Sequence, residues 1–169
     1  LDDVVIADGI ATGKLRAEGL EQILPKEKLE ALKRTSGEHG FATVLVNDPG
    51  FATQDPALFS GLTMTYYGRW TYKFEEAARQ GAAGVLIVHE TEAAAYGWDV
   101  VRNGWTGPQF DLPPEEDAEP RVPIQGWITS EVATKLFADA GLDFEALRQA
   151  ADQRGFKAVP LDATLSVDL

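Results

Sequence analysis

Residues 70–89 have the sequence WTYKFEEAARQGAAGVLIVH, and this stretch decides the fold class. Four apolar residues follow the spacing of one helix face, namely Trp70, Phe74, Ala77 and Ala78. Gly81 is suited to ending that helix. Residues 83–89 are an apolar, β-branched run typical of a buried strand, and FATVLV at 41–46 is a second such run. The order strand, helix, strand predicts an α/β fold in which a helix packs across paired strands.

The segments before and between these elements are less regular. Residues 3–7 predict a short strand, and residues 15–35 predict a helix that is broken at Pro25. Residues 47–61 are rich in turn-forming residues and predict a long loop. Residues 91–121 show little periodicity, so we expect a second long loop there, and loops of this length are usually functional or mobile.

The remainder of the chain predicts alternating strands and helices. Residues 122–128 predict a third buried strand. Ser130 and Asp143 are suited to capping the two helices that follow, because their side-chain oxygens accept hydrogen bonds from free backbone N–H groups. Residues 156–161 and 163–169 predict two final strands.

Composition excludes several classes of protein. The formal net charge is −12 over 169 residues. A nucleic-acid partner and an anionic membrane surface both require basic residues, so we expect neither as a partner. The chain contains no cysteine, which excludes disulfides, thiolate metal sites and a cysteine nucleophile. No stretch approaches the length of about 20 apolar residues that a membrane span needs.

The sequence offers no catalytic motif. His89-Glu90 begins like the zinc-binding HExxH helix, but Ala93 stands where the second histidine belongs. We therefore interpret His89 as the hydrogen-bonded end of a buried strand, and we expect no metal or cofactor in this chain. Acidic residues at 115–119 lack the spacing of a calcium loop. A hydrolase built on two carboxylates that meet only in space stays open as an alternative.

Aromatic and arginine side chains are the strongest candidates for a binding site, because these residue types dominate interaction hot spots. They lie before the central helix and in the 91–121 loop. We interpret Trp70 and Phe74 as core residues. The candidate peptide- or partner-binding residues are Tyr66, Tyr67, Arg69, Trp98, Trp105, Gln109 and Phe110.

Three strings of sequence resemble one known family. They are VLVNDPGF (44–51), LFSGLTMTYYGRWTYKFEEAARQGAAGVLIVHETEAAAYGWDVVRNGWTGPQFDL (58–112) and RVPIQGWITSEVATKLFADAGLDFEAL (121–147). They closely resemble the protease-associated (PA) domain of bacterial zinc-dependent aminopeptidases, in the two-zinc group that includes glutamate carboxypeptidase. The resemblance covers residues 43–169, approximately.

The resemblance implies a fold and a role. The implied fold is an α/β domain with a curved, partly closed sheet flanked by helices, forming a single domain over residues 1–169. The implied role is non-catalytic: the domain shapes substrate access, or binds peptide or protein segments, beside an adjacent peptidase domain. The two zinc ions of such enzymes belong to that peptidase domain, and the enzymes are periplasmic or secreted.

The resemblance does not extend to residues 8–40. Members of the family enter the domain through a Gly-Tyr-Gly strand and a Trp-Asp-Asp-Tyr turn, whereas this segment is helical in pattern and rich in Lys, Glu and Leu. We therefore expect an atypical helical segment at 8–40 and a family-like region at 41–169. An engineered or permuted scaffold derived from a PA domain, without natural activity, is the alternative that this segment leaves open.

Overall fold

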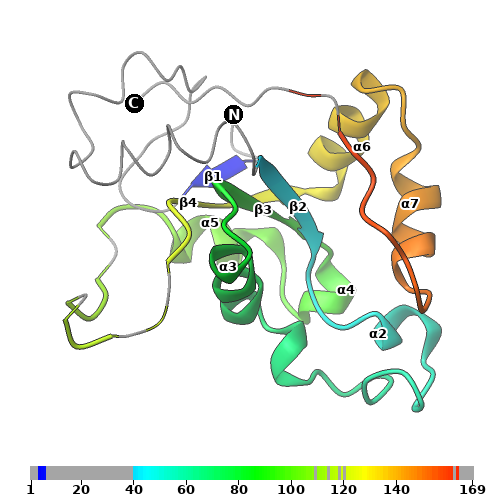
Figure 1. The fold of residues 1–169 in the computed structure, drawn as a ribbon, viewed down its shortest axis with the longest axis horizontal. Helices are drawn as coiled ribbons and strands as arrows, with labels where there is room; N and C mark the ends of the chain where they lie inside the picture. The colour runs from blue at the N-terminus through cyan, green and yellow to red at the C-terminus, as the bar shows by residue number, and fades with distance from the viewer. Residues whose placement is uncertain are drawn as a thin grey trace.

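A four-stranded sheet forms the centre of the computed structural model, which describes residues 4–6, 40–108, 110–113, 115–117, 119, 121–161 and 163 (Figure 1). Its strands are β1 (Val4–Ile6), β2 (Phe41–Leu45), β3 (Gly84–His89) and β4 (Ile124–Thr129). The strand order is β1-β4-β3-β2. Strands β2, β3 and β4 are parallel, and β1 pairs with β4 in the antiparallel direction.

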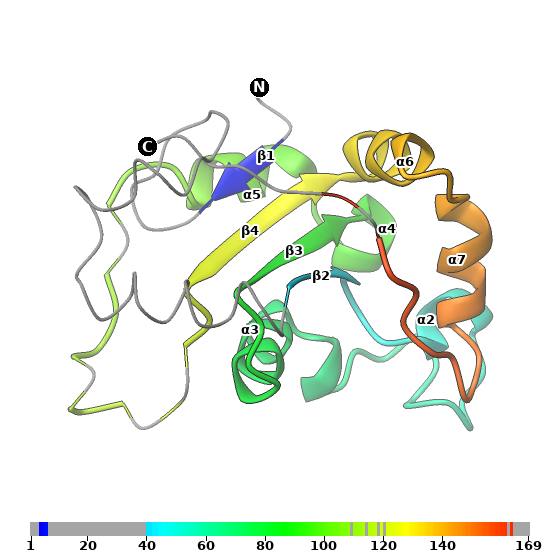
Figure 2. The same cartoon turned by 45° about the horizontal axis from the view of Figure 1, so that its top comes forward.

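Helices connect the parallel strands, as parallel pairing requires. Between β2 and β3 lie α2 (Gly50–Thr53), the 3-10 helix η2 (Tyr66–Gly68) and α3 (Trp70–Arg79). Between β3 and β4 lie α4 (Thr91–Ala94) and α5 (Trp98–Gly104). After β4 come α6 (Ser130–Asp139) and α7 (Phe144–Ala151). Figure 2 shows α4, α6 and α7 near the end of the sheet towards which the three parallel strands point.

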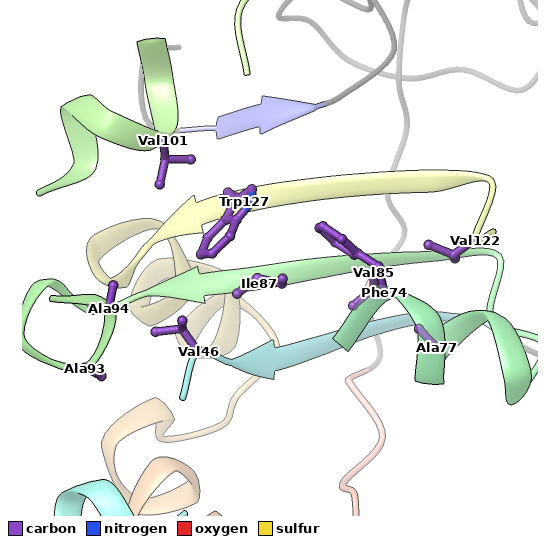
Figure 3. Close-up of a cluster of buried hydrophobic side chains, with 10 residues drawn as sticks. All are labelled: Val46, Phe74, Ala77, Val85, Ile87, Ala93, Ala94, Val101, Val122 and Trp127. Carbon is purple, nitrogen blue, oxygen red and sulfur yellow. The ribbon is translucent and has the colours of Figure 1, made fainter. Parts of the chain in front are cut away.

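Alternation along β3 and β4 gives the sheet two apolar faces. Val85, Ile87 and Trp127 belong to one buried cluster, together with side chains from α3, α4 and α5 such as Phe74 and Val101 (Figure 3). Their exposure is 5% or less of each residue's surface. Complete burial of an aliphatic or aromatic side chain of this size contributes about 1.5–3 kcal/mol.

The opposite face packs against the last two helices. Leu86, Val88 and Ile128 form a second buried cluster with Ala133 of α6 and Phe144 of α7. Because successive side chains of a strand point to opposite faces, a strand covered by helices on both faces is apolar at every position. This is why GVLIVH has no polar residue before His89.

A close cross-strand contact fixes the start of β2 against β3. Phe41 lies opposite Gly84 in the parallel ladder. A Cβ atom added to Gly84 would stand 2.3 Å from Cε1 of Phe41, so the aromatic ring occupies the space that a side chain would need. Glycine at this strand position is therefore required by packing and not by a turn.

Most of the predicted elements are confirmed. The α/β class, β1, β3, β4 and α3 are present close to the expected residues, and Gly81 follows α3 with a φ of +76°. The carboxylate of Asp143 caps α7 by accepting a hydrogen bond from the backbone N–H of Ala146.

Several expectations were wrong in detail. In the run at 41–46, residues 41–45 form a half-buried edge strand and not a buried one, and only Val46 is buried. The 91–121 segment contains α4 and α5. Thr129, not Ser130, caps α6 by accepting from the N–H of Val132. Residues 156–161 are exposed and irregular except for half-buried Leu161.

Other expectations concern closure of the sheet and the ends of the chain. The described strands form an open sheet, in which β1 and β2 are the two edges, and not the partly closed one that was expected. The predicted helix at 15–35 and nearly all of the predicted strand at 163–169 lie outside the described residues. No helix in the described part is both long and apolar enough to cross a membrane.

Candidate functional site

A group of aromatic rings lies at the beginning of α3, and all but the half-buried Tyr72 are exposed. We call it the aromatic surface, and it consists of Phe59, Tyr66, Tyr67 and Tyr72. Tyr72 makes edge-to-face contacts with Tyr66 and Tyr67, at centroid distances of 5.6 and 5.0 Å. Tyr67 makes a third such contact with Phe59 at 6.2 Å. Each edge-to-face pair contributes about 0.5–1.5 kcal/mol beyond its buried area, so the rings hold one another in place.

The aromatic surface is open to solvent. Tyr66 and Tyr67 are about half exposed, at 53% and 52%, and Phe59 is 43% exposed. Phe59 also has a φ of +56°, in the left-handed region that costs a residue with a Cβ about 1–2 kcal/mol. Exposed aromatic side chains held by such a backbone conformation are characteristic of interaction sites.

The loop that carries these rings is anchored by Asp48, which is 5% exposed. Its Oδ2 accepts a hydrogen bond from the backbone N–H of Thr65 at 2.6 Å, and its Oδ1 accepts from the Thr65 hydroxyl at 3.0 Å. Burial lowers the pKa of the nearby Lys73, and the negative charge of Asp48 opposes that shift. Asp48 therefore ties the residue before η2 to the end of β2.

Asn47 completes this anchor. Its φ of +70° lies in the left-handed region, which asparagine tolerates better than most residues. Its backbone N–H donates to the carbonyl of Gly68, and its side-chain Nδ2 donates to the carbonyl of Ala93 at 2.7 Å. One residue at the carboxyl end of β2 thus connects η2 with α4. We call Asn47 and Asp48, with these bonds, the loop anchor.

Charged side chains surround the aromatic surface on the α3 side. The carboxylate of Glu75 accepts a hydrogen bond from the Tyr66 hydroxyl, at 2.7 Å from both oxygens, and this bond is the main cause of a raised Tyr66 pKa. The guanidinium of Arg79 lies 5.3 Å from the ring centre of Tyr72 and within 4.0 Å of Glu75, Glu76 and Glu119. Acidic groups therefore outnumber basic ones here.

A second group of aromatic rings runs from the surface into the core. Trp70 is 39% exposed and contacts Trp105 at 5.3 Å, and Trp105 contacts the completely buried Trp127 at 6.2 Å. Phe74 is buried beside Trp70 and Trp105. The core assignment is confirmed for Phe74, whereas Trp70 lies at the edge of the core with one side in solvent.

The predicted binding residues are divided between these two groups. Tyr66 and Tyr67 meet at Tyr72, whereas Trp98 and Trp105 are half-buried against the core. Arg69, the residue directly before α3, is exposed, and Phe110, in the long loop after α5, is 96% exposed. Gln109 lies outside the described residues.

Phe59 was not among the predicted binding residues. It lies seven residues before Tyr66, inside a loop whose path the sequence does not reveal. The only available signal was an aromatic side chain within the turn-rich run PALFSG, at 56–61.

His89 has the structural role that the sequence predicts. It is 4% exposed, and its Nε2 lies 3.0 Å from the carbonyl oxygen of Tyr96. Burial lowers its pKa, and the hydrogen bond to Tyr96 opposes that change. Its ring also lies 5.6 Å from that of Trp98. Across the described ranges, no three or more His, Cys, Asp or Glu side chains are grouped in a way that would hold a metal ion.

Comparison with family models, with curated proteins and with solved structures gives no match for this chain.

Proposed function

We propose that the protein is a non-catalytic interaction domain of the PA type, which binds a protein or peptide segment through the aromatic surface. The observation that carries the proposal is the exposure of Phe59, Tyr66 and Tyr67, three rings that are joined through contacts with one another or with Tyr72, on a loop fixed by Asp48. Rigid aromatic side chains bind with a small loss of conformational entropy, since they have only two rotatable side-chain bonds.

The family resemblance supports a particular partner. In a bacterial two-zinc aminopeptidase, the neighbouring peptidase domain or its peptide substrate would contact the aromatic surface. The two zinc ions would belong to that peptidase domain, and the protein would act outside the cytoplasm, as a secreted or periplasmic protein. The long strings at 58–112 and 121–147 support this assignment.

Affinity measurements with variants test the proposal. Tyr67→Ala and Phe59→Ala would each be titrated by calorimetry against the peptidase domain of a two-zinc aminopeptidase that lacks its own PA domain. Removal of a hot-spot aromatic costs about 2 kcal/mol or more, which corresponds to a Kd about 30-fold weaker. Phe156→Ala is the matched control, because Phe156 is 42% exposed, nearly as much as Phe59 at 43%, and lies outside the aromatic surface.

Two results would contradict the proposal. Equal affinities for wild type, Tyr67→Ala and Phe59→Ala, with unfolding transitions unchanged, would exclude the aromatic surface as the binding site. Hydrolysis of aminoacyl reporter substrates by the purified chain with added zinc would exclude a non-catalytic role.

A further inference from the structure

A separate hollow of about 420 Å³ lies at the carboxyl end of the parallel strands, between α6 and α7. Glu90 and Ser130, which directly follow β3 and β4, line its inner side, and Leu142 and Phe144 provide apolar lining. Its volume is within the range of small-molecule sites, at the lower end. In open parallel sheets, ligands bind outside the carboxyl ends of the strands, which is where this hollow lies.

The two hydroxyl groups that line the hollow donate their protons to backbone carbonyl groups. The Ser130 hydroxyl donates to the carbonyl of His89 at 2.9 Å, and the Thr134 hydroxyl donates to the carbonyl of Ser130 at 2.8 Å. A hydroxyl that has donated its proton keeps lone pairs that can accept. Both hydroxyls therefore offer acceptors to a ligand.

Arg148 supplies the positive charge at the hollow, and two of its five N–H donors are engaged by Glu145. Its Nε and Nη2 donate to the two carboxylate oxygens of Glu145, at 2.9 and 2.8 Å. Its Nη1 lies 3.5 Å from Glu90 Oε1, which is longer than a well-formed charge-assisted hydrogen bond. An anionic ligand that used Nε and Nη2, the pair of donors that forms a bidentate bond, would have to displace Glu145 from the guanidinium.

The negative charge of Glu90 is therefore only partly neutralised by Arg148. Its side chain is 24% exposed. Burial raises the pKa of Glu90, and Arg148 only partly offsets that increase. Burial also raises the pKa of Asp152, which senses the same Arg148. A half-buried carboxylate with one distant cation is stabilised by any further cation that reaches it.

We propose that this hollow binds an ammonium group carried on an apolar stem. The ammonium would donate to the Glu90 carboxylate and to the Ser130 hydroxyl oxygen, and the stem would pack against Leu142 and Phe144. The proposal does not depend on the aromatic surface, since no residue of that surface lines the hollow. Either proposal can fail while the other stands.

The test uses n-butylammonium as the probe and n-butanol as its neutral counterpart, each titrated into the whole chain and followed by ¹H–¹⁵N NMR. We expect saturable shifts with n-butylammonium at residues 90, 130, 134 and 144–148, and none with n-butanol. No saturable shift with n-butylammonium, or the same shifts with both probes, would overturn the proposal.

Three variants locate the site. Glu90→Gln should weaken n-butylammonium binding about tenfold, because a charge-assisted hydrogen bond is lost. Asp139→Asn is the matched control: it makes the same charge change on an exposed side chain of α6, which pairs with Lys135. Ala138→Phe should abolish binding, since the phenyl ring fills the hollow from an exposed position and the substitution keeps every charge. Equal affinities for Glu90→Gln and Asp139→Asn, or undiminished binding by Ala138→Phe, would refute the proposal.

The natural source of the ammonium is distinguished by two further probes. Nα-acetyl-lysine amide presents a side-chain ammonium, and alanyl-leucinamide presents a peptide amino terminus. The tighter of the two identifies the source. Saturation by neither would overturn the proposal, since both carry the ammonium that the hollow is inferred to bind.

Discussion

Replacement of Asp48 by alanine tests whether the loop anchor holds the aromatic surface in place. The change removes two hydrogen bonds from a buried carboxylate to Thr65 and leaves the backbone N–H of Thr65 without its acceptor. Bonds to charged groups contribute about 1.5–3 kcal/mol each, so we expect a loss of about 3–6 kcal/mol in the free energy of unfolding. This is a large part of the about 5–15 kcal/mol available to a domain.

The assay combines urea unfolding with amide hydrogen exchange. Asp48→Ala should lower the urea midpoint, and the Thr65 amide should lose more protection than the amide of Ile87 in the central strand. Asp48→Asn is the matched comparison, because a flipped amide can keep both contacts to Thr65 without the charge and should cost less. Asp55→Asn serves as the control: Asp55 is exposed and accepts from the N–H of Ala57, so we expect little change.

If Asp48→Ala unfolds at the wild-type urea concentration with the same slope, the buried carboxylate does not stabilise the fold. If the Thr65 amide exchanges at the wild-type rate relative to Ile87, the carboxylate does not hold the loop, whatever the overall stability. A loosened loop should also weaken partner binding through Tyr66 and Tyr67, because the rings would lose their fixed arrangement.

Three further predictions concern packing, titration and capping. Gly84→Ala should lower the free energy of unfolding by about 1–3 kcal/mol, as measured in urea. The same substitution should lower it far less in a Phe41→Ala background. Equal losses in the two backgrounds would exclude the ring contact as the cause. The imidazole of His89 should titrate below pH 6.5 by NMR, because burial disfavours its charged form. The pKa of His89 is then higher in the unfolded chain than in the folded one, so the free energy of unfolding should decrease as the pH falls below 6.5. His89→Gln should remove this pH dependence. Asp143→Ala should cost about 1 kcal/mol by removing the cap of α7, and an unchanged urea midpoint would argue against the cap.

The central strands and helices were predictable because local pattern and tertiary environment agree there. The run GVLIVH is apolar at every position since helices cover both faces of β3. The helix over residues 70–79 has an apolar face that packs on that strand, and glycine follows it in the left-handed conformation. Each signal arises within a few residues, so the sequence contains it directly.

Other features depend on contacts between distant residues, and the sequence does not display them. FATVLV has the composition of a central strand, but its place at the edge of the sheet leaves residues 41–45 half-buried. Thr129 and Ser130 are both good capping residues, and only the end of β4 decides that Thr129 is the cap. Residues 156–161 carry apolar side chains, but they pair with none of the described strands.

The candidate site was predictable only in part, for the same reason. Tyr66 and Tyr67 are adjacent in sequence, so their association with the start of α3 was visible. Phe59 reaches them through a left-handed backbone turn, and Asp48 fixes the loop from 17 residues away. The hollow beside Glu90 is assembled from α6, α7, the connection between them and the residue after β3, and no short motif marks it.

The contact of Trp70 with Trp105, and of Trp105 with Trp127, gives the protein an internal optical reporter. Excitation absorbed by one indole passes readily to another at such separations, so the emission reflects the whole series of rings. Trp70 is in contact with solvent, whereas Trp127 is screened from it. A ligand that covers Trp70 should therefore alter the emission spectrum without any attached dye, and iodide should quench only the solvent-exposed fraction of the light.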